Sequence, residues 1–254
     1  MKAVQFHGHG GQDVIQYDEV PEQPPGPNEV RIDVKAAALN HLDVWTRRGM
    51  PGLDLEMPHT PGSDAAGVVV AVGENVERFQ QNDRVAVSAG VSCGRCEFCR
   101  DGEESMCVRF QVIGEHRPGV HAEQAVVPAD NLVPVPEGVE WEVAGSSALV
   151  FQTAWRMLVT RADLQPTDSV LVLGASGGVG HAAVQIADHV GGEVYATASS
   201  EEKLGYAADC GADHVIDYTE KNYADEIRAR TGKRGGGGVG DHVAGEPRRA
   251  ALAW

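Results

Sequence analysis

Short stretches of alternating apolar and polar residues dominate the first half of the chain. They are separated by Gly, Pro and Asn, and the Pro/Gly-rich segment 24–27 is one such turn. A period of two predicts half-buried strands, and several short strands bounded by turn residues predict a compact, barrel-like β domain. The expected strands are Lys2–Phe6, Val30–Ala36, Gly67–Gly73, Asp83–Ser88, Ala122–Pro128 and Leu132–Val135.

The pattern changes near Val139, where apolar residues begin to recur at helical spacing over residues 141–160. Val170–Leu173 is then a continuous apolar run, as is typical of a buried parallel strand. Strands and helices alternate beyond it, which predicts a parallel, doubly wound sheet. The further expected elements are the helix His181–Val190, the strand Glu193–Ala198, the helix Glu201–Cys210, the strand His214–Ile216 and a polar helix over Thr219–Thr231.

We therefore predict an α/β chain with a β-rich domain at 1–128 and a doubly wound sheet at 129–254. The sheet is expected to be incomplete at its C-terminal end. Five glycines fall within Lys233–Gly240, where the pattern requires another apolar strand, and glycine weakens a strand. A doubly wound sheet usually continues for two more strand–helix units after this point.

Four of the five cysteines lie within fifteen positions, at Cys93, Cys96, Cys99 and Cys107. The residues between them are polar or turn-forming, so the loop can fold back and bring four thiolates onto one ion. Zinc accepts a tetrahedral shell of four sulfurs, and a closed shell leaves no open position for chemistry. The spacing therefore predicts one zinc ion with a structural role.

Other uses of clustered cysteines fit this chain less well. A disulfide needs an oxidising compartment, but the chain begins without the charged and apolar regions of an export signal, so we expect a cytoplasmic protein. An iron–sulfur cluster favours a shorter last gap followed by proline. The fifth cysteine, Cys210, stands alone and is expected to be a packed thiol.

The glycine-rich run 174–180 follows a predicted strand and opens a predicted helix. Glycine permits a tight turn and a close approach to a pyrophosphate, and the helix N-terminus offers free N–H groups and a partial positive charge. In this context the run predicts a dinucleotide site, with a glycine-rich structural turn as the alternative. The residues expected to form it are Ala175, Gly177, Gly178, Val179 and Gly180.

The end of the next strand indicates which dinucleotide is bound. NAD sites place an acid there for the ribose hydroxyls, whereas this strand ends in small residues that include Ser199. Such residues leave room for a 2′-phosphate and Lys203 supplies positive charge, so we expect NADP(H). Glu201 and Glu202 count against this choice, although acids also suit the first turn of a helix.

Charge and hydropathy exclude several classes of partner. The chain has 37 acidic and 21 basic residues and a formal net charge of -16, which disfavours nucleic acid and anionic membranes. No apolar run approaches the length of a membrane span. An acidic surface poor in lysine fits a high-salt cytoplasm, where ions screen self-repulsion, and it fits an ordinary acidic protein equally well.

Several of these motifs together resemble the zinc-containing medium-chain dehydrogenase/reductase family of alcohol dehydrogenases and quinone reductases. They are the four-cysteine lobe, the segments Pro61–Val68 and Gly119–Glu123, and the glycine turn. The resemblance covers residues 1–223 and implies a GroES-like catalytic domain followed by a Rossmann domain, with a small-molecule substrate in the cleft between them. From Gly235 onward the chain departs from the family pattern and looks like a truncated relative.

The resemblance also indicates where zinc-dependent members hold a second, catalytic zinc. The corresponding positions are Asn40, Ser63 and Leu149, and a neighbouring glutamate corresponds to Asp64. Leucine has no donor atom, and Asn and Ser offer only neutral oxygens, so this set does not suit zinc. The resemblance therefore implies that the structural zinc is kept and the catalytic zinc is absent.

The segment Asn40–Asp43 is similar to the Asn-x-x-Asp of zinc-independent quinone and enone reductases. Without zinc, Asn40 is the candidate donor to negative charge developing on oxygen. Asp43 is expected to orient its neighbours, and Ser63 to border the substrate; simple turn residues are the alternatives for Asn40 and Ser63. The proton-relay positions of alcohol dehydrogenases look like Leu42 and Trp45, and Trp45 is expected to wall the pocket unless it is ordinary core.

Two other residues match family contacts to the cofactor. His41 matches a position near the pyrophosphate, with a solvent-facing histidine as the alternative. Thr153 matches a nicotinamide-contacting threonine, with a helix-packing threonine as the alternative.

Taken together, the matches imply an NADPH-dependent oxidoreductase that reduces a quinone or an α,β-unsaturated carbonyl without catalytic zinc. A zinc- and nucleotide-binding remnant without turnover, and a zinc-dependent alcohol dehydrogenase, are the alternatives. Homo-oligomerisation stays open, because family members often pair through a sheet edge that the chain does not reach.

Overall fold

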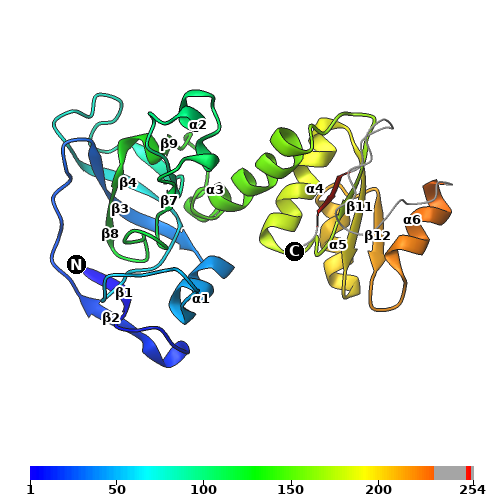
Figure 1. Cartoon of the computed structure of the whole chain (residues 1–254), viewed down its shortest axis with the longest axis horizontal. Coiled ribbons are helices and arrows are strands. Elements are labelled where there is room, and N and C mark those ends of the chain that lie inside the picture. Colours follow the sequence, from blue (N-terminus) through cyan, green and yellow to red (C-terminus); the bar gives the residue numbers. More distant parts are fainter. Residues whose placement is uncertain (232–249, 253–254) are drawn as a thin grey trace. The chain divides into compact units, whose positions relative to one another are not determined.

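The structure, a computed structural model, describes residues 1–231 and 250–252 and divides into two compact units. Unit 1 is Met1–Leu149 and unit 2 is Val150–Trp254. Helix α3 (Trp141–Trp155) begins in unit 1 and continues into unit 2 (Figure 1). Because the division by packing falls inside this helix, the boundary expected after residue 128 stays a prediction.

An antiparallel five-stranded sheet forms the centre of unit 1. Residues that alternate along its strands, such as Val30 and Ile32, are fully buried, and Val69 and Val85 on neighbouring strands pack in the same core. This is the outcome expected for a sheet with one covered face. The strand order is β8 (Gln124–Pro128), β3 (Glu29–Ala38), β4 (Asp64–Val72), β5 (Arg84–Val87) and β9 (Leu132–Pro134).

Unit 1 also contains elements that the sequence pattern did not predict. β1 (Lys2–Phe6) was expected, but its antiparallel partner β2 (Ile15–Glu19) is largely exposed and so lacks a strand-like alternation. A 3₁₀ turn (Gln12–Val14) lies between them, and another (Ala129–Asn131) joins β8 to β9. Helix α1 (His41–Arg48) follows β3 and is only eight residues long.

A small lobe leaves the sheet between β5 and β8. β6 (Gly90–Val91) and β7 (Gln111–Val112) pair antiparallel and close its base. Helix α2 (Glu97–Arg100) and a 3₁₀ turn (Glu104–Met106) lie between these strands. Strands of two residues are too short to carry a periodic signal, which is why the sequence predicted only a loop here.

The first half of α3 packs closely on unit 1. A Cβ at Gly145 would lie 2.8 Å from the Ala36 carbonyl oxygen, so the helix approaches β3 at that point. The guanidinium of Arg84 on β5 stacks 3.8 Å from the ring centroid of Trp141, at the start of the helix. These contacts fix Leu149, the last residue of unit 1, relative to the sheet.

Unit 2 contains a parallel four-stranded sheet. Its order is β12 (His214–Asp217), β11 (Glu193–Ala198), β10 (Ser169–Val172) and β13 (Ala250–Leu252). In the order of the chain this is 3-2-1-4, the order with which a Rossmann sheet begins. The doubly wound sheet is therefore present, with β13 in the place of the fourth strand. The glycine-rich segment 233–240 lies outside the described residues.

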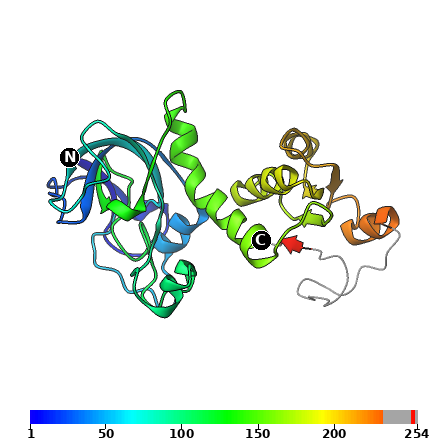
Figure 2. The same ribbon diagram turned by 90° about the horizontal axis from the view of Figure 1, so that it is seen from above.

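Three helices accompany this sheet: α4 (Gly178–Val190), α5 (Glu201–Asp209) and α6 (Tyr223–Thr231). Figure 2 shows α6 at the β12 edge of the sheet. Helix α6 begins later than the predicted Thr219, because the Asp217 carboxylate accepts the backbone N–H of Thr219 at 2.8 Å and holds a turn there. The α-helix α3 ends before the predicted residue 160, and a π-helical segment (Arg156–Arg161) continues from it. Within 1–231 and 250–252, no helix is both long and apolar enough to span a membrane.

Candidate functional site

The four clustered cysteines converge within the lobe between β6 and β7. Their Sγ atoms all lie within 4.8 Å of one another. Cys96 is the N-cap of α2 and Cys99 lies in its single turn, which brings their sulfurs to 3.4 Å. Cys107 follows the 3₁₀ turn, and its Sγ accepts the backbone N–H of Cys93 at 3.3 Å. Four thiols from one loop provide the ligand number and chemistry of a closed zinc shell.

Backbone N–H groups around the cluster favour the thiolate form of two cysteines. A hydrogen bond from the backbone of Arg95 is the main cause that lowers the pKa of Cys93 to about 5. A bond from the backbone of Cys99 lowers the pKa of Cys96. Burial, reinforced by the neighbouring sulfurs, raises the pKa of Cys99 to about 11. A divalent cation among the sulfurs would favour the thiolate form of Cys99, which burial otherwise disfavours.

Asn40 and Asp43, both predicted site residues, lie at the start of α1. Asp43 Oδ2 accepts the backbone N–H of Asn40 at 2.7 Å, and its Oδ1 accepts the backbone N–H of Gly62 at 3.1 Å. The Asp43 carboxylate is buried, so both of its oxygens serve the backbone. These bonds tie the start of the helix to the turn that precedes β4.

The side chain of Asn40 faces Asp64, the first residue of β4. Asn40 Nδ2 donates to Asp64 Oδ2 at 2.9 Å, and Asp64 Oδ1 accepts the backbone N–H of Leu149 at 2.9 Å. Asp64 is only 1% exposed, and burial raises the pKa of its carboxyl. Two of the three positions that the family resemblance assigned to a catalytic zinc are thus bridged by this carboxylate. Sequence reasoning identified Asp64 only as a replaced glutamate and missed this bridge.

The remaining predicted residues of unit 1 are arranged differently. Ser63 is fully buried, and its hydroxyl donates to the carbonyl of Ile113 at 2.8 Å. His41 and Trp45 lie on exposed positions of α1 with their ring centroids 5.9 Å apart, so Trp45 is not ordinary core. The structure therefore brings Asn40 and Asp43 together, whereas the Ser63 hydroxyl is directed toward the end of β7.

The glycine turn links β10 to α4. The backbone N–H of Ala175 donates to the Thr197 carbonyl at 2.9 Å, and that of Gly174 donates to the Thr197 hydroxyl at 3.2 Å. A Cβ at Gly180 would lie 2.4 Å from the Gly174 carbonyl oxygen, so this position packs helix against turn. At Gly177 the nearest atom to such a Cβ, the Gly174 carbonyl oxygen, is 3.4 Å away, which is ordinary van der Waals contact, so a methyl group fits there.

The start of α4 is available to an anion. Gly177 is the N-cap, and it has no side chain that could accept a hydrogen bond from the first turn. The N–H groups of Gly178, Val179 and Gly180 have no partner within the helix, because the first-turn donors of any helix point outward. Together with the positive end of the helix dipole, these groups fit a pyrophosphate.

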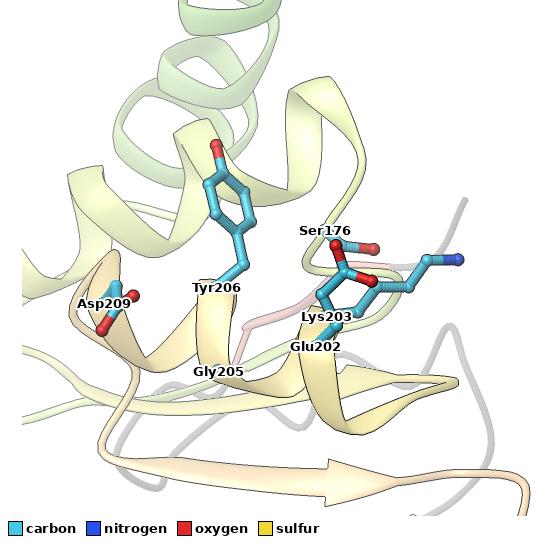
Figure 3. A pocket seen from close by; sticks show the side chains of 6 residues that line it. All are labelled: Ser176, Glu202, Lys203, Gly205, Tyr206 and Asp209. Atoms are coloured by element: carbon cyan, nitrogen blue, oxygen red, sulfur yellow. The ribbon is translucent and has the colours of Figure 1, made fainter.

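A pocket lies between the glycine turn and α5 (Figure 3). Lys203 Nζ lies 3.5 Å from Ser199 Oγ, so these two predicted cofactor residues meet at the end of β11. Glu202 shares the pocket with Lys203, although it also belongs to the first turn of α5 as expected. The lining residues are Ser176, Glu202, Lys203, Gly205, Tyr206 and Asp209. Sequence reasoning missed Ser176 and Tyr206.

Two other predicted residues belong to this part of the chain. Thr153 is half-buried on the part of α3 that lies in unit 2. Cys210 is partly buried and packs against the apolar core of unit 2, as expected for a packed thiol.

Comparison with known proteins gives matches to two family models. Residues 26–137 match the alcohol dehydrogenase GroES-like domain, and residues 178–253 match the zinc-binding dehydrogenase domain. The first covers the sheet of unit 1 and the cysteine lobe, and the second begins at α4. These matches confirm the expected order of a GroES-like domain followed by a Rossmann-like domain.

Individual relatives agree with this assignment. The chain is 34% identical to an alcohol dehydrogenase of Schizosaccharomyces pombe, over 95% of this chain and 68% of the relative. It is 32% identical to the human quinone oxidoreductase, over 92% of this chain and 64% of the relative. A solved NAD-dependent alcohol dehydrogenase is 47% identical, with a TM-score of 0.88, and the match covers 91% of this chain and 68% of that structure. A solved quinone oxidoreductase of Pseudomonas syringae pv. Tomato DC3000 is 31% identical, with a TM-score of 0.76. The match covers 91% of this chain and 63% of that structure.

The chain belongs to the zinc-containing medium-chain dehydrogenase/reductase family of oxidoreductases. Both alcohol dehydrogenases and quinone oxidoreductases are among its relatives. The chain spans about two thirds of the length of these relatives, from 64% to 68% for the two curated proteins named above.

Proposed function

We propose that this protein transfers a hydride from NADPH to a quinone or an α,β-unsaturated carbonyl without a catalytic zinc. The observation that carries the proposal is the bridge from Asn40 through Asp64 to the backbone of Leu149. A leucine offers no ligand atom, and an amide that donates to a carboxylate is a poor partner for a cation. The arrangement therefore supports reduction assisted by hydrogen bonds.

Asn40 supplies the donor in this proposal. The nicotinamide, when bound, supplies the hydride. Hydride addition to a quinone or enone moves negative charge onto the carbonyl oxygen, and a fixed N–H group stabilises that charge. Asn40 Nδ2 donates to one acceptor among the described residues, Asp64, which leaves its second N–H for a substrate oxygen.

The preference for NADPH rests on Ser199 and Lys203. Their proximity gives the end of β11 a hydroxyl and a positive charge, the groups that suit a 2′-phosphate. Glu202 in the same pocket opposes a phosphate by charge repulsion. The balance of these charges therefore decides how strongly NADPH is preferred over NADH.

We also propose that Cys93, Cys96, Cys99 and Cys107 hold one structural zinc. Their convergence within 4.8 Å supports a closed shell. A reducing compartment such as the cytoplasm keeps thiols available as metal ligands. Because the ligands lie in a separate lobe, this zinc is expected to brace the loop and take no part in hydride transfer.

The test is consumption of NADPH, followed at 340 nm, by the purified protein with a benzoquinone and with a simple enone. Turnover of either, with one zinc per chain by elemental analysis, is expected. Oxidation of a primary alcohol together with two zinc ions per chain would instead show a zinc-dependent alcohol dehydrogenase. Binding of zinc and NADPH without turnover would favour the alternative of a binding protein.

Two charge-removing variants test the cofactor preference. Lys203→Gln is expected to weaken NADPH binding about tenfold, equivalent to about 1.4 kcal/mol, and to leave NADH binding within about twofold. Glu202→Gln is expected to strengthen NADPH binding, because it removes the repulsion. Titration of nucleotide fluorescence measures both, and tighter binding of NADH than NADPH by the unaltered protein would refute the preference.

A further inference from the structure

The buried carboxylate of Asp64 is held by a hydrogen bond at each of its two oxygens. One oxygen accepts Asn40 Nδ2 and the other accepts the backbone N–H of Leu149, both at 2.9 Å. The Leu149 donor belongs to a helix packed on the sheet, so the carboxylate cannot rotate without losing that bond. At 1% exposure, water does not compete for either oxygen.

The groups around Asp64 leave it facing Asn40. The nearby Asp43 carboxylate accepts the backbone N–H groups of Asn40 and Gly62. The imidazole of His121 is paired through Nε2 with the Ala38 carbonyl at 3.1 Å. The two neighbouring titratable side chains, Asp43 and His121, are therefore engaged elsewhere.

A carboxylate accepts hydrogen bonds and donates none, whereas a carboxamide has a donor end and an acceptor end of almost equal size. With Asp64 ionised, Asn40 must turn its NH₂ toward the carboxylate. The amide's shape is the same either way round. Its side chain also faces the backbone N–H of Asp43 in a capping box, but makes no hydrogen bond to it, because that N–H donates to the Asn40 carbonyl at 3.0 Å. The hydrogen bond that distinguishes the two orientations is therefore the one to Asp64. The reverse would present the amide oxygen where the donor N–H now lies, and an acceptor there would repel the developing negative charge.

We propose that Asp64 is the positioning residue that fixes the polarity of the Asn40 carboxamide, so that an N–H rather than the amide oxygen meets the substrate carbonyl. This inference rests on the proposed function, because it concerns the donor role of Asn40. It assigns a role to the first residue of β4, whose carboxylate is engaged by Asn40 and by the backbone of Leu149.

The decisive variant is Asp64→Asn, which changes the polarity of the group and almost nothing of its shape. The new amide oxygen is expected to keep the fixed N–H of Leu149. Its NH₂ group then faces Asn40, which must turn over to present its oxygen. We expect kcat for quinone or enone reduction to fall about 100-fold, as for the loss of one donor to a developing oxyanion, with KM changed by less than about threefold.

A double-mutant cycle separates positioning from a general structural effect. Asn40→Ala alone is expected to lower kcat about 100-fold. In that background Asp64→Asn should lower kcat by less than about twofold further, because there is no amide left to orient. A second loss of about 100-fold would show that Asp64 acts through something other than Asn40 and would overturn the inference.

A readout without turnover keeps the inference separate from the proposed function. The side-chain NH₂ resonances of Asn40, identified by their loss in Asn40→Ala, are followed in ¹⁵N-labelled protein. Asp64→Asn should shift them strongly, since a carboxylate acceptor is removed. Unshifted resonances would refute the inference even if the protein proved inactive. Conversely, full activity of Asn40→Ala together with the expected shift would refute the donor role and leave the polarity of the amide as proposed.

Asp168→Asn is the matched control. Asp168 is another buried carboxylate that accepts a backbone N–H, from Gln165 at 2.8 Å, but it lies before β10 in unit 2. The Asp168→Asn variant should leave the Asn40 resonances unshifted. If Asp64→Asn does not fold, Asp64→Glu provides the test. It keeps an acceptor-only group facing Asn40, so the Asn40 NH₂ resonances should stay near their positions in the unaltered protein. Resonances typical of an amide without a carboxylate acceptor, together with unchanged kcat, would overturn the inference.

Discussion

Among single residues, Cys107 is the most buried of the four clustered thiols, at 6% exposure. Cys107→Ser replaces a soft sulfur with a neutral hydroxyl, which is a poor zinc ligand. We expect zinc content to fall from about one per chain to well below one, with a lower thermal midpoint, because the proposed zinc would brace the lobe. Elemental analysis and a melting curve measure the two effects.

Cys210→Ser is the matched control, since Cys210 packs in unit 2 and belongs to no cluster. It should keep a full complement of zinc. Equal loss of zinc from both variants would contradict the assignment of the metal to the lobe.

The burial of Asp64 predicts how the free energy of unfolding depends on pH. Burial raises the pKa of its carboxyl in the folded chain above the value in the unfolded chain. Between these two pKa values the folded state binds more protons, so the contribution of Asp64 to the free energy of unfolding falls as pH rises through this window. Asp64→Asn removes the titrating group and hence this decline.

The measurement is urea unfolding of both proteins at a low pH near the ordinary aspartate pKa and at a higher pH, since the folded pKa is raised above that value. The stability of Asp64→Asn relative to the unaltered protein should be greater at the higher pH. A difference that is the same at both values would show that the carboxyl titrates at its ordinary pKa.

Some residues of the candidate site could be predicted from the sequence alone, and others could not. Asn40 and Asp43 could be selected because their spacing matched a family motif, and the same spacing, an N-cap with an acid three residues on, is also a signal for the start of α1. The link from Asn40 to Asp64 joins residues 24 positions apart. No local pattern encodes it, because it depends on how β3 and β4 are paired in the sheet.

At the scale of elements, the glycine turn separates a packing role from a binding role. Gly180→Ala would force a Cβ to within 2.4 Å of a carbonyl oxygen, so we expect it to destabilise unit 2 by about 1–3 kcal/mol. Gly177→Ala meets its nearest atom at 3.4 Å and should fold normally. It should nevertheless weaken NADPH binding, because glycine at this turn lets the backbone approach the proposed pyrophosphate closely and a methyl group would intervene.

Each variant is the control for the other, with stability measured by urea unfolding and affinity by nucleotide fluorescence. If Gly177→Ala bound NADPH as tightly as the unaltered protein, the pyrophosphate would not lie against the backbone of Gly177.

The elements that could be predicted are those with a long, regular pattern. β1 and β11 have the expected bounds, and β10 and β12 differ by one residue at their ends. The elements that were missed are short or exposed. β6 and β7 have two residues each, and β2 buries none of its residues fully. None of the three strands therefore shows the apolar periodicity from which a strand is predicted.

For the whole molecule, the dominant property is its net charge of -16. Salt shortens the range of charge repulsion, from about 10 Å at about 0.1 M to about 3 Å at about 1 M. We therefore expect the thermal midpoint to rise by a few degrees between these concentrations of KCl, by relief of self-repulsion. Equal osmolality of sucrose serves as the control for solvent exclusion, and a midpoint independent of KCl would contradict the expectation.

The closure of the cysteine lobe by its own β6–β7 hairpin has a consequence for how the protein is made. All four sulfurs come from residues 93–107, and both strands at the base lie within 90–112. Metal capture therefore needs no segment that emerges later from the ribosome. If the cluster binds zinc as proposed, the nascent chain presents all four ligands before β8 and β9 exist to complete the main sheet, and loading would be a local, early step in synthesis.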